Sequence, residues 1–427
     1  WFSITNGLPK GSLVWRLVQD HVNKNLLFLA TEYGIYASFD QGGKWIKFSN
    51  GLPTISFRDL AIQKHENDLI GASFGRSFYV FDDYSLLREI NEETLRQEGV
   101  LFKPRTALQY VPIRGGSASQ GGNYFIADNP PYGAVLRYYL ADDYKTIEEL
   151  RKDSEKKLTG NIPFPGWDKL EAEKNQQKPK AILVVRNSEN EVVSKIEGPL
   201  KKGFQEVSWD LTTPMVTDLK PGPSPDTGRR RSRRSIMVAP GTYSVTLYKE
   251  VDGETSQLGA PQTFTIKRIR ENVLDNPLSS EISNYTAEYM TFSTTVSEME
   301  YEMEKAEKML QAFDRAIVFT TNKPGDIESR LASLKKDYHR LNSEISGNSA
   351  KKEVGEKDDP TIEDRLDVAR EGFSGNTYGP TKMHMESLAM GKLLYGELKP
   401  DLDKFLKTDL PAMKRALEDA GAPLILD

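Results

Sequence analysis

The sequence of 427 residues predicts a multidomain, mainly β protein with an α-helical C-terminal part. Three observations predict this fold class. A short phrase recurs near the start, strand-like alternation fills the middle, and apolar residues at heptad spacing fill the end. A chain of this length exceeds one ordinary core, so we expect two to four domains.

The recurring phrase indicates a repeat fold. The Trp at the start of residues 1–9 and the Asn-Gly-Leu-Pro at their end recur at the same places in residues 45–53, an offset of 44 residues, which lies within the range of roughly 40–50 residues for propeller blades. Each copy is followed by short apolar strands separated by polar or glycine turns, a pattern typical of all-β structure. Residues 1–92 are therefore predicted to form β-propeller blades. The expected strands are residues 14–19, 27–31, 35–39, 57–63, 69–73 and 78–81.

A turn motif lies between the two copies. Ser38-Phe-Asp40-Gln-Gly42-Gly-Lys-Trp45 resembles the Asp-box, S-x-D-x-G-x-[ST]-W, and departs from it only at Lys44. In such a hairpin the serine and aspartate accept backbone N–H bonds, glycine supplies a positive φ, and the tryptophan covers the turn. Sialidases carry these boxes, but we interpret Ser38, Asp40, Gly42 and Trp45 as structural residues.

Three stretches, residues 32–40, 74–83 and 129–139, resemble the tail of large bacterial proteins of the sortilin-type or BNR (Asp-box) repeat "glycosyl hydrolase" family. The resemblance covers essentially the whole chain in order, with about two blades of propeller. It implies a protein that is secreted, periplasmic or on the bacterial surface. The hydrolase label of the family rests on the repeat, and a repeat is not a mechanism. Because the chain starts inside a repeat, we expect a fragment whose remaining propeller lies upstream.

The middle of the chain predicts a second β domain. After a linker over residues 93–122, alternating strands indicate an immunoglobulin-like or fibronectin type III-like sandwich over residues 123–270, with Trp209 in its core. Insertions are expected at residues 142–178 and 212–239. The second insertion holds Arg229 to Arg234, with five arginines in six residues. We interpret this run as a solvated loop, the alternatives being a site for an anionic glycan or phosphate, or a protease-sensitive site.

The C-terminal part, residues 271–427, predicts an antiparallel helical bundle. Apolar residues over 292–317 and over 327–345 alternate spacings of four and three, and Pro and Gly in residues 322–325 stop the first helix. Further helices are expected at residues 361–370, 381–397 and 400–420, with a polar loop at residues 346–360. An alternative role for this hairpin is a partner-binding coiled coil.

Composition limits the classes of function. Apolar residues make up 38% and charged residues 28% of the chain, as in a soluble globular protein, and no apolar run is long enough to span a bilayer. The formal net charge of −5 argues against a nucleic-acid partner, whose phosphates demand a basic excess. Cysteine is absent and the four histidines are scattered. We therefore expect no catalytic residue, cofactor or metal site in this chain.

One face of the propeller is the candidate ligand face. In a blade, the turn between the second and third strands and the start of the innermost strand lie at the same end. Aromatic side chains there can stack on sugars, and charged ones can bond hydroxyls. The leading interpretation is an exported binding or scaffolding protein for polysaccharide or a partner protein. The alternative is the accessory part of a glycoside hydrolase whose catalytic carboxylates lie upstream. The candidate residues are Arg16, Glu32, Tyr33, Arg58, Phe74 and Arg76.

Overall fold

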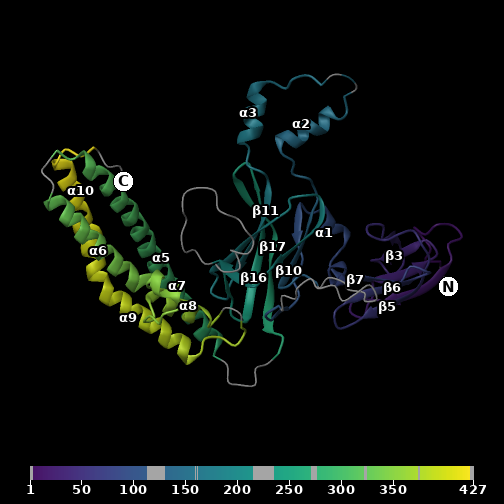
Figure 1. Cartoon of the computed structure of the whole chain (residues 1–427). Helices are drawn as coiled ribbons and strands as arrows, with labels where there is room; N and C mark the ends of the chain where they lie inside the picture. The colour runs from purple at the N-terminus through teal and green to yellow at the C-terminus, as the bar shows by residue number, and fades with distance from the viewer. Residues whose placement is uncertain are drawn as a thin grey trace. The chain divides into compact units, whose positions relative to one another are not determined.

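The computed structural model describes residues 3–112, 130–158, 160, 162–214, 235–270, 277–321, 325–373 and 376–423. It is a mixed structure with several antiparallel β-sheets and a helical C-terminal part (Figure 1). Contacts divide the described residues into two units. The β unit takes those within 1–107, 115–210 and 242–266, and the helical unit takes those within 108–114, 211–241 and 267–427. The arginine run Arg229 to Arg234 lies outside the described residues.

The β unit begins with two antiparallel sheets whose strands follow one another in the chain. Their positions agree with the predicted strands to within a residue at each end. The first sheet has the order β1 (Val14–Gln19), β2 (Leu27–Thr31), β3 (Gly34–Ser38), β4 (Ile46–Lys47). The second has the order β5 (Phe57–Gln63), β6 (Asp68–Ser73), β7 (Phe78–Phe81).

These two sheets share one apolar core. Phe28 and Ile35 from the first sheet and Phe57 and Leu60 from the second belong to the same buried cluster. Gly71 on β6 lets the sheets approach, because a Cβ there would lie 2.9 Å from Cδ1 of Ile35. Burying such side chains stabilises the contact by about 1.5–3 kcal/mol each, so apolar burial holds the two sheets together.

A buried ion pair joins the same two sheets at one end. Both carboxylate oxygens of Asp20, whose side chain is fully buried, accept bonds from Arg88, at 2.8 Å each. Tyr84 donates its hydroxyl to Asp20 at 2.6 Å, and the backbone N–H of Asn23 donates at 2.6 Å. Tyr84 and Arg88 lie in the 3-10 helix η1 (Tyr84–Arg88), which follows β7. The network therefore ties the β1–β2 turn to the end of the second sheet.

This network makes stability dependent on pH. Burial alone would raise the pKa of Asp20, but the bonds from Arg88, Tyr84 and Asn23 outweigh burial and hold that pKa well below its ordinary value of 3.8. A carboxyl with a lowered pKa contributes its full stability above about pH 4 and loses it as the pH falls further. We expect the difference in unfolding free energy between the wild type and Asp20→Asn to be constant from about pH 8 to 5 and to shrink below about pH 4. Urea unfolding at several pH values measures it, and a difference that stays constant down to pH 2 would contradict the assignment.

Two further sheets fill the rest of the β unit. One has the order β13 (Gly203–Trp209), β10 (Ala134–Leu140), β8 (Gly99–Leu101). The other carries β12 (Val192–Gly198), β11 (Lys180–Arg186), β16 (Gly241–Val251) and β17 (Glu254–Arg268) side by side. As predicted, Trp209 is buried, and its ring contacts those of Tyr243 and Phe264 at 5.8 and 6.3 Å. These aromatic contacts connect the two sheets.

The segment expected to be a linker is partly structured. It contains α1 (Glu92–Arg96), β8 and β9 (Ala107–Gln109), while residues 113–122 lie outside the described residues. β8 pairs with β10. Of the expected insertions, the first carries α2 (Ile147–Glu155) and α3 (Trp167–Asn175), and the second begins with β14 (Thr212–Pro214) and reaches β15 (Ser235–Met237).

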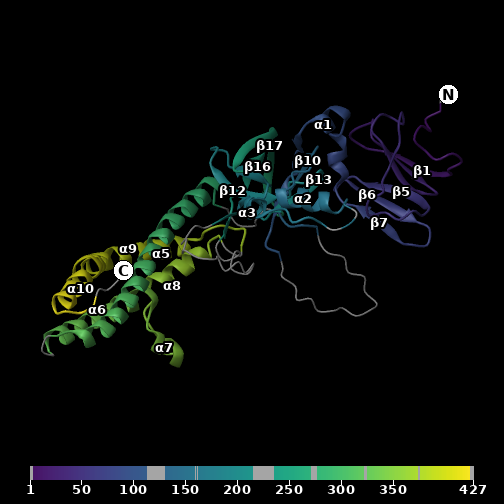
Figure 2. The ribbon, with the colours of Figure 1, turned by 90° about the horizontal axis from the view of Figure 1, so that it is seen from above.

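The helical unit is built on a long hairpin (Figure 2). The apolar residues that the heptad pattern placed on the facing seams are mostly buried, among them Phe313 and Leu341. The seams therefore form the core of this unit, as predicted. Its helices are α5 (Ser279–Ala316), η2 (Ile317–Phe319), α6 (Asp326–Ser346), α7 (Ser349–Val354), α8 (Ile362–Arg370), α9 (Lys382–Lys404), η3 (Phe405–Asp409) and α10 (Leu410–Asp419).

Two details of the helical prediction are wrong. The expected break before Pro400 is absent, because α9 passes through it and continues through the π-helical turn η3 into α10. The wider turn comes just before Pro411, which has no N–H to donate and whose ring would clash with a carbonyl one turn back. The polar stretch 346–360, expected to be a loop, contains the short helix α7, capped by Asn348.

Candidate functional site

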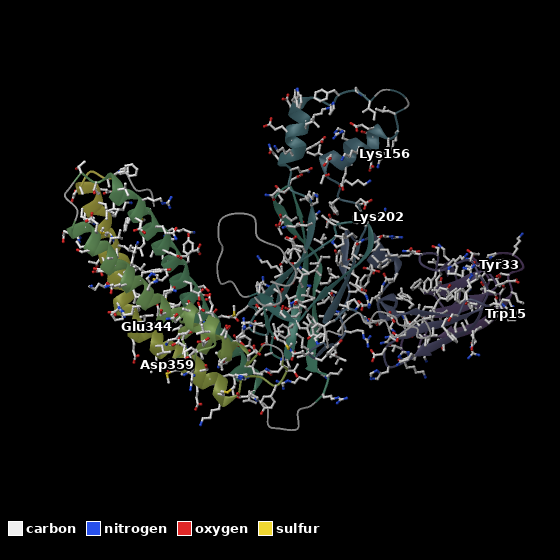
Figure 3. All side chains as sticks on the ribbon, viewed as in Figure 1. Trp15, Tyr33, Lys156, Lys202, Glu344 and Asp359 are labelled. Atoms are coloured by element: carbon white, nitrogen blue, oxygen red, sulfur yellow. The ribbon has the colours of Figure 1, made fainter. Side chains whose placement is uncertain are left out.

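One end of the first two sheets collects the predicted ligand-face residues. Val14 pairs with Thr31, Thr31 pairs with Gly34, and Phe57 pairs with Ser73. The starts of β1 and β5 therefore lie at the same end of their sheets as the β2–β3 and β6–β7 turns. Figure 3 shows Trp15 and Tyr33 in this region. We call it the aromatic end, formed by Trp15, Arg16, Glu32, Tyr33, Arg58, Asp59, Phe74 and Arg76.

An arginine held between two aromatic rings is the most organised feature of the aromatic end. The guanidinium carbon of Arg58 lies 3.7 Å from the ring centroid of Trp15 and 4.8 Å from that of Phe74. A cation over a ring is worth about 0.5–2 kcal/mol, so Arg58 orients both rings. Trp15 remains 38% exposed and Phe74 68% exposed. The site thus presents fixed aromatic surfaces to solvent.

The sequence prediction included Arg58 and Phe74 but missed Trp15. The available signal was the strand Val14–Gln19, where Trp15 stands next to Arg16 in an otherwise apolar run. Nearly every residue of this strand is exposed, so Trp15 is not a core residue. The contact with Arg58 crosses from one sheet to the other, and spacing along the chain does not reveal it.

The other predicted ligand-face residues lie around the Trp15–Arg58–Phe74 stack, and their side chains make few hydrogen bonds or ion pairs. Arg16 pairs with Asp59 at 3.3 Å, and both side chains are more than half exposed. An exposed pair contributes only about 0–1 kcal/mol, so a ligand can replace it at low cost. Within the described part of the chain, no hydrogen bond or ion pair holds the side chains of Glu32, Tyr33 or Arg76. These groups are available to an incoming ligand.

The turn at residues 38–45 lies at the opposite end of the first sheet. The Ser38 hydroxyl donates to Asp40 at 2.7 Å and accepts from the Gly42 N–H at 2.8 Å. Asp40 also accepts from the Lys44 N–H at 2.9 Å, and these bonds lower the pKa of its carboxyl. Trp45 is buried and donates its ring N–H to a backbone carbonyl. The turn is held by its own bonds and does not join the aromatic end.

The aromatic end has the chemistry of recognition. Its rings offer stacking surfaces, its arginines can donate to hydroxyl, carboxylate or sulfate oxygens, and Glu32 can accept from hydroxyls. Among the residues that the structure describes, no three His, Asp or Glu side chains come close enough to hold a metal ion together. Within the same residues, no helix combines the length and apolarity that crossing a bilayer requires.

Comparisons with known proteins identify no family for this chain. No family model matches the chain, and no curated protein matches it. Among solved structures, the chain is similar to the extracellular domain of a putative one-component system from B. thetaiotaomicron, with 12% identity, a TM-score of 0.15, and coverage of 62% of this chain and 26% of that one. The extracellular domain of a putative hybrid two-component system from the same organism is similar at 11% identity and a TM-score of 0.15, covering 61% of this chain and 26% of that one. Likeness at this TM-score carries no argument, and the sortilin-type or BNR-repeat resemblance stays a hypothesis.

Proposed function

We propose that this chain is the binding portion of an exported bacterial protein and that it recognises polysaccharide through the aromatic end. The observation that carries the proposal is the Trp15–Arg58–Phe74 stack, which holds aromatic rings in place while leaving them exposed. Sugar rings present apolar C–H faces that pack on aromatic rings, and their hydroxyls bond to charged side chains. Both kinds of group meet at this end.

Polysaccharide is favoured over a protein partner by the mixture of groups. The core of a protein interface is depleted in aspartate and glutamate, whereas arginine and aromatic residues are enriched there. At the aromatic end, by contrast, the carboxylates of Glu32 and Asp59 accompany the rings, next to Tyr33 and Arg58 in the sequence. A charged rim this close to the stacking surface suits a ligand with many hydroxyls. A partner protein bound at the same end is the second candidate, and a screen with glycans distinguishes the two.

The first two sheets are proposed to be consecutive blades of a propeller that other blades complete. Three observations support this: the repeat offset of 44 residues, the shared core between the sheets, and the exposure of β1. Leu13 and Leu17 are 48% and 47% exposed. In a propeller the first strand of each blade lines the central channel, so neighbouring blades would surround these side chains.

A glycan-binding screen, run alongside an assay for released reducing sugar, tests the proposal. We expect binding without turnover. Trp15→Ala is expected to weaken binding on the order of tenfold or more, which corresponds to about 1.4 kcal/mol, because it removes one ring and releases Arg58 from its stack. Phe74→Ala should weaken binding in the same direction. Titration calorimetry of each variant with the selected glycan measures the effect.

Phe319→Ala is the matched control, because Phe319 is 64% exposed and lies on η2, far along the chain from the aromatic end. It should bind like the wild type. The proposal fails if no glycan binds, or if Trp15→Ala binds as tightly as Phe319→Ala. Release of reducing sugar would favour the alternative, an accessory part of a glycoside hydrolase.

A further inference from the structure

Helices α2 and α3 and the loop between them form a projection that the proposed function does not use. We call residues 145–176 the arm. Figure 1 shows α2 and α3 beyond the ends of the strands that carry them, between β10 and β11. The arm is fixed at its base, since Gln176 accepts from the Ile147 N–H at 2.7 Å and donates to Asp252 at 2.9 Å. These bonds attach the base of the arm to the β unit.

Ion pairs hold α2 and α3 together, and the two helices share no apolar core. Arg151 on α2 donates two bonds to Glu173 on α3, at 2.6 and 2.8 Å, and a third to Glu155 at 2.7 Å. The side chain of Glu173 is only 6% exposed and that of Arg151 only 22%. Neither helix contains a buried residue. A bidentate arginine–carboxylate pair of this kind fixes the geometry of the hairpin.

The apolar side chains of the arm point into solvent. Trp167 is 77% exposed and Phe164 is 62% exposed, with their rings 5.1 Å apart and nearly perpendicular. Leu158 and Ile162 on the same loop are 53% and 57% exposed. Leaving four large apolar groups of one short segment in water is unfavourable, and such exposed groups often mark an interaction surface.

The charges at the tip of the arm indicate what covers it. Residues 156–167 include two lysines, Lys156 and Lys157, and no aspartate or glutamate. Lys156 is 77% exposed, and its pairing with Asp153 at 3.4 Å is loose. Within the described residues no hydrogen bond or ion pair holds the Lys157 side chain. Asp153, Glu155 and Asp168 lie just outside this range, so the two exposed lysines stand within the apolar tip and the carboxylates at its edges. Apolar and aromatic groups beside exposed lysines complement the acyl chains and phosphates of an anionic bilayer surface.

The backbone at residues 163–166 is conformationally restricted. Pro163 and Pro165 flank Phe164, and Gly166 has a φ of 97°, which directs the chain sharply into α3. Because the rings are already positioned, little conformational freedom is lost when they leave water. The ion pair between Arg151 and Glu173 keeps the hairpin folded when the tip enters another medium.

We infer that the tip of the arm inserts Leu158, Ile162, Phe164 and Trp167 into the interface of an anionic lipid bilayer, with Lys156 and Lys157 bound to lipid phosphates. Tryptophan suits this depth, since its ring is apolar and its N–H reaches polar groups. The arm would attach the protein to a membrane surface without crossing it. This role is independent of polysaccharide binding at the aromatic end.

Sedimentation with sucrose-loaded vesicles tests the inference. We expect the wild type to bind vesicles of phosphatidylcholine and phosphatidylglycerol, and the double variant Phe164→Ser, Trp167→Ser to lose at least tenfold in partition coefficient. Lys156→Glu with Lys157→Glu should reduce binding to anionic vesicles while leaving any binding to pure phosphatidylcholine unchanged. Tryptophan emission should shift to the blue on binding, and this shift should disappear with Trp167→Phe.

Phe319→Ser is the control for nonspecific adhesion, because it removes an exposed ring from another part of the chain. All these positions are exposed, so the urea midpoints of the variants should match that of the wild type. Wild type that fails to bind anionic vesicles, or a double variant that binds like Phe319→Ser, overturns the inference. Self-association of the wild type that the double variant abolishes, without vesicle binding, shows that a second copy covers the tip and also overturns it.

Discussion

Asp20→Asn is expected to lower the free energy of unfolding of the β unit by about 3–5 kcal/mol, because removing one partner of a buried ion pair leaves the other charge uncompensated. Arg88 is only 17% exposed and would lose both of its bonds to a carboxylate. The Tyr84 hydroxyl would donate to the neutral amide oxygen of the new Asn side chain, and this bond is weaker than one to a carboxylate. Urea unfolding followed by tryptophan fluorescence measures the change.

Asp59→Asn is the matched control, since Asp59 also pairs with an arginine but is 65% exposed. An exposed pair is worth about 0–1 kcal/mol, so this variant should unfold close to the wild type. Equal unfolding midpoints for Asp20→Asn and Asp59→Asn would show that the buried network stabilises the β unit no more than the exposed pair does.

Phe313→Ala is expected to destabilise the helical unit by about 3–5 kcal/mol, because truncation of a buried phenylalanine removes apolar contacts and leaves a cavity. Phe313 is 0% exposed and belongs to the core formed by the two heptad seams. Phe319→Ala, six positions further along the chain on η2, should lower the free energy of unfolding by less than about 0.5 kcal/mol, since that ring is exposed. Helical circular dichroism during urea unfolding compares the two, and equal losses would contradict the assigned core.

The elements of the fold were predictable where local signals agree. The strands of the first two sheets are bounded by turns with Gly, Asn and Asp. These turn residues locate the strands in the sequence and therefore also the residues at the strand ends. The seam from Phe292 to Phe313 was predictable because a heptad pattern places the same residues on one face whatever they pack against. The continuity of α9 was not predictable, because proline at position 400 disfavours a helix locally and packing against neighbouring helices stabilises it there.

The candidate site was only partly predictable. Antiparallel connectivity places Glu32, Tyr33 and Arg76 near one end of the sheets, so their clustering follows from the order of strands and turns in the sequence. The stack of Trp15 on Arg58 depends on how two sheets pack, and no pattern within either sheet contains that information. The exposure of the apolar side chains of the arm was hidden for a similar reason, since a loop sequence does not tell whether protein or solvent covers its apolar residues.

Radical footprinting of the protein with and without the selected polysaccharide tests the central claim most directly, because it reports which side chains the ligand covers. The account predicts that Trp15, Tyr33 and Phe74 become protected from oxidation. Trp167 and Phe319, which are exposed elsewhere, should react at unchanged rates. Protection of Trp167 or Phe319 with no change at Trp15, Tyr33 and Phe74 would contradict the account.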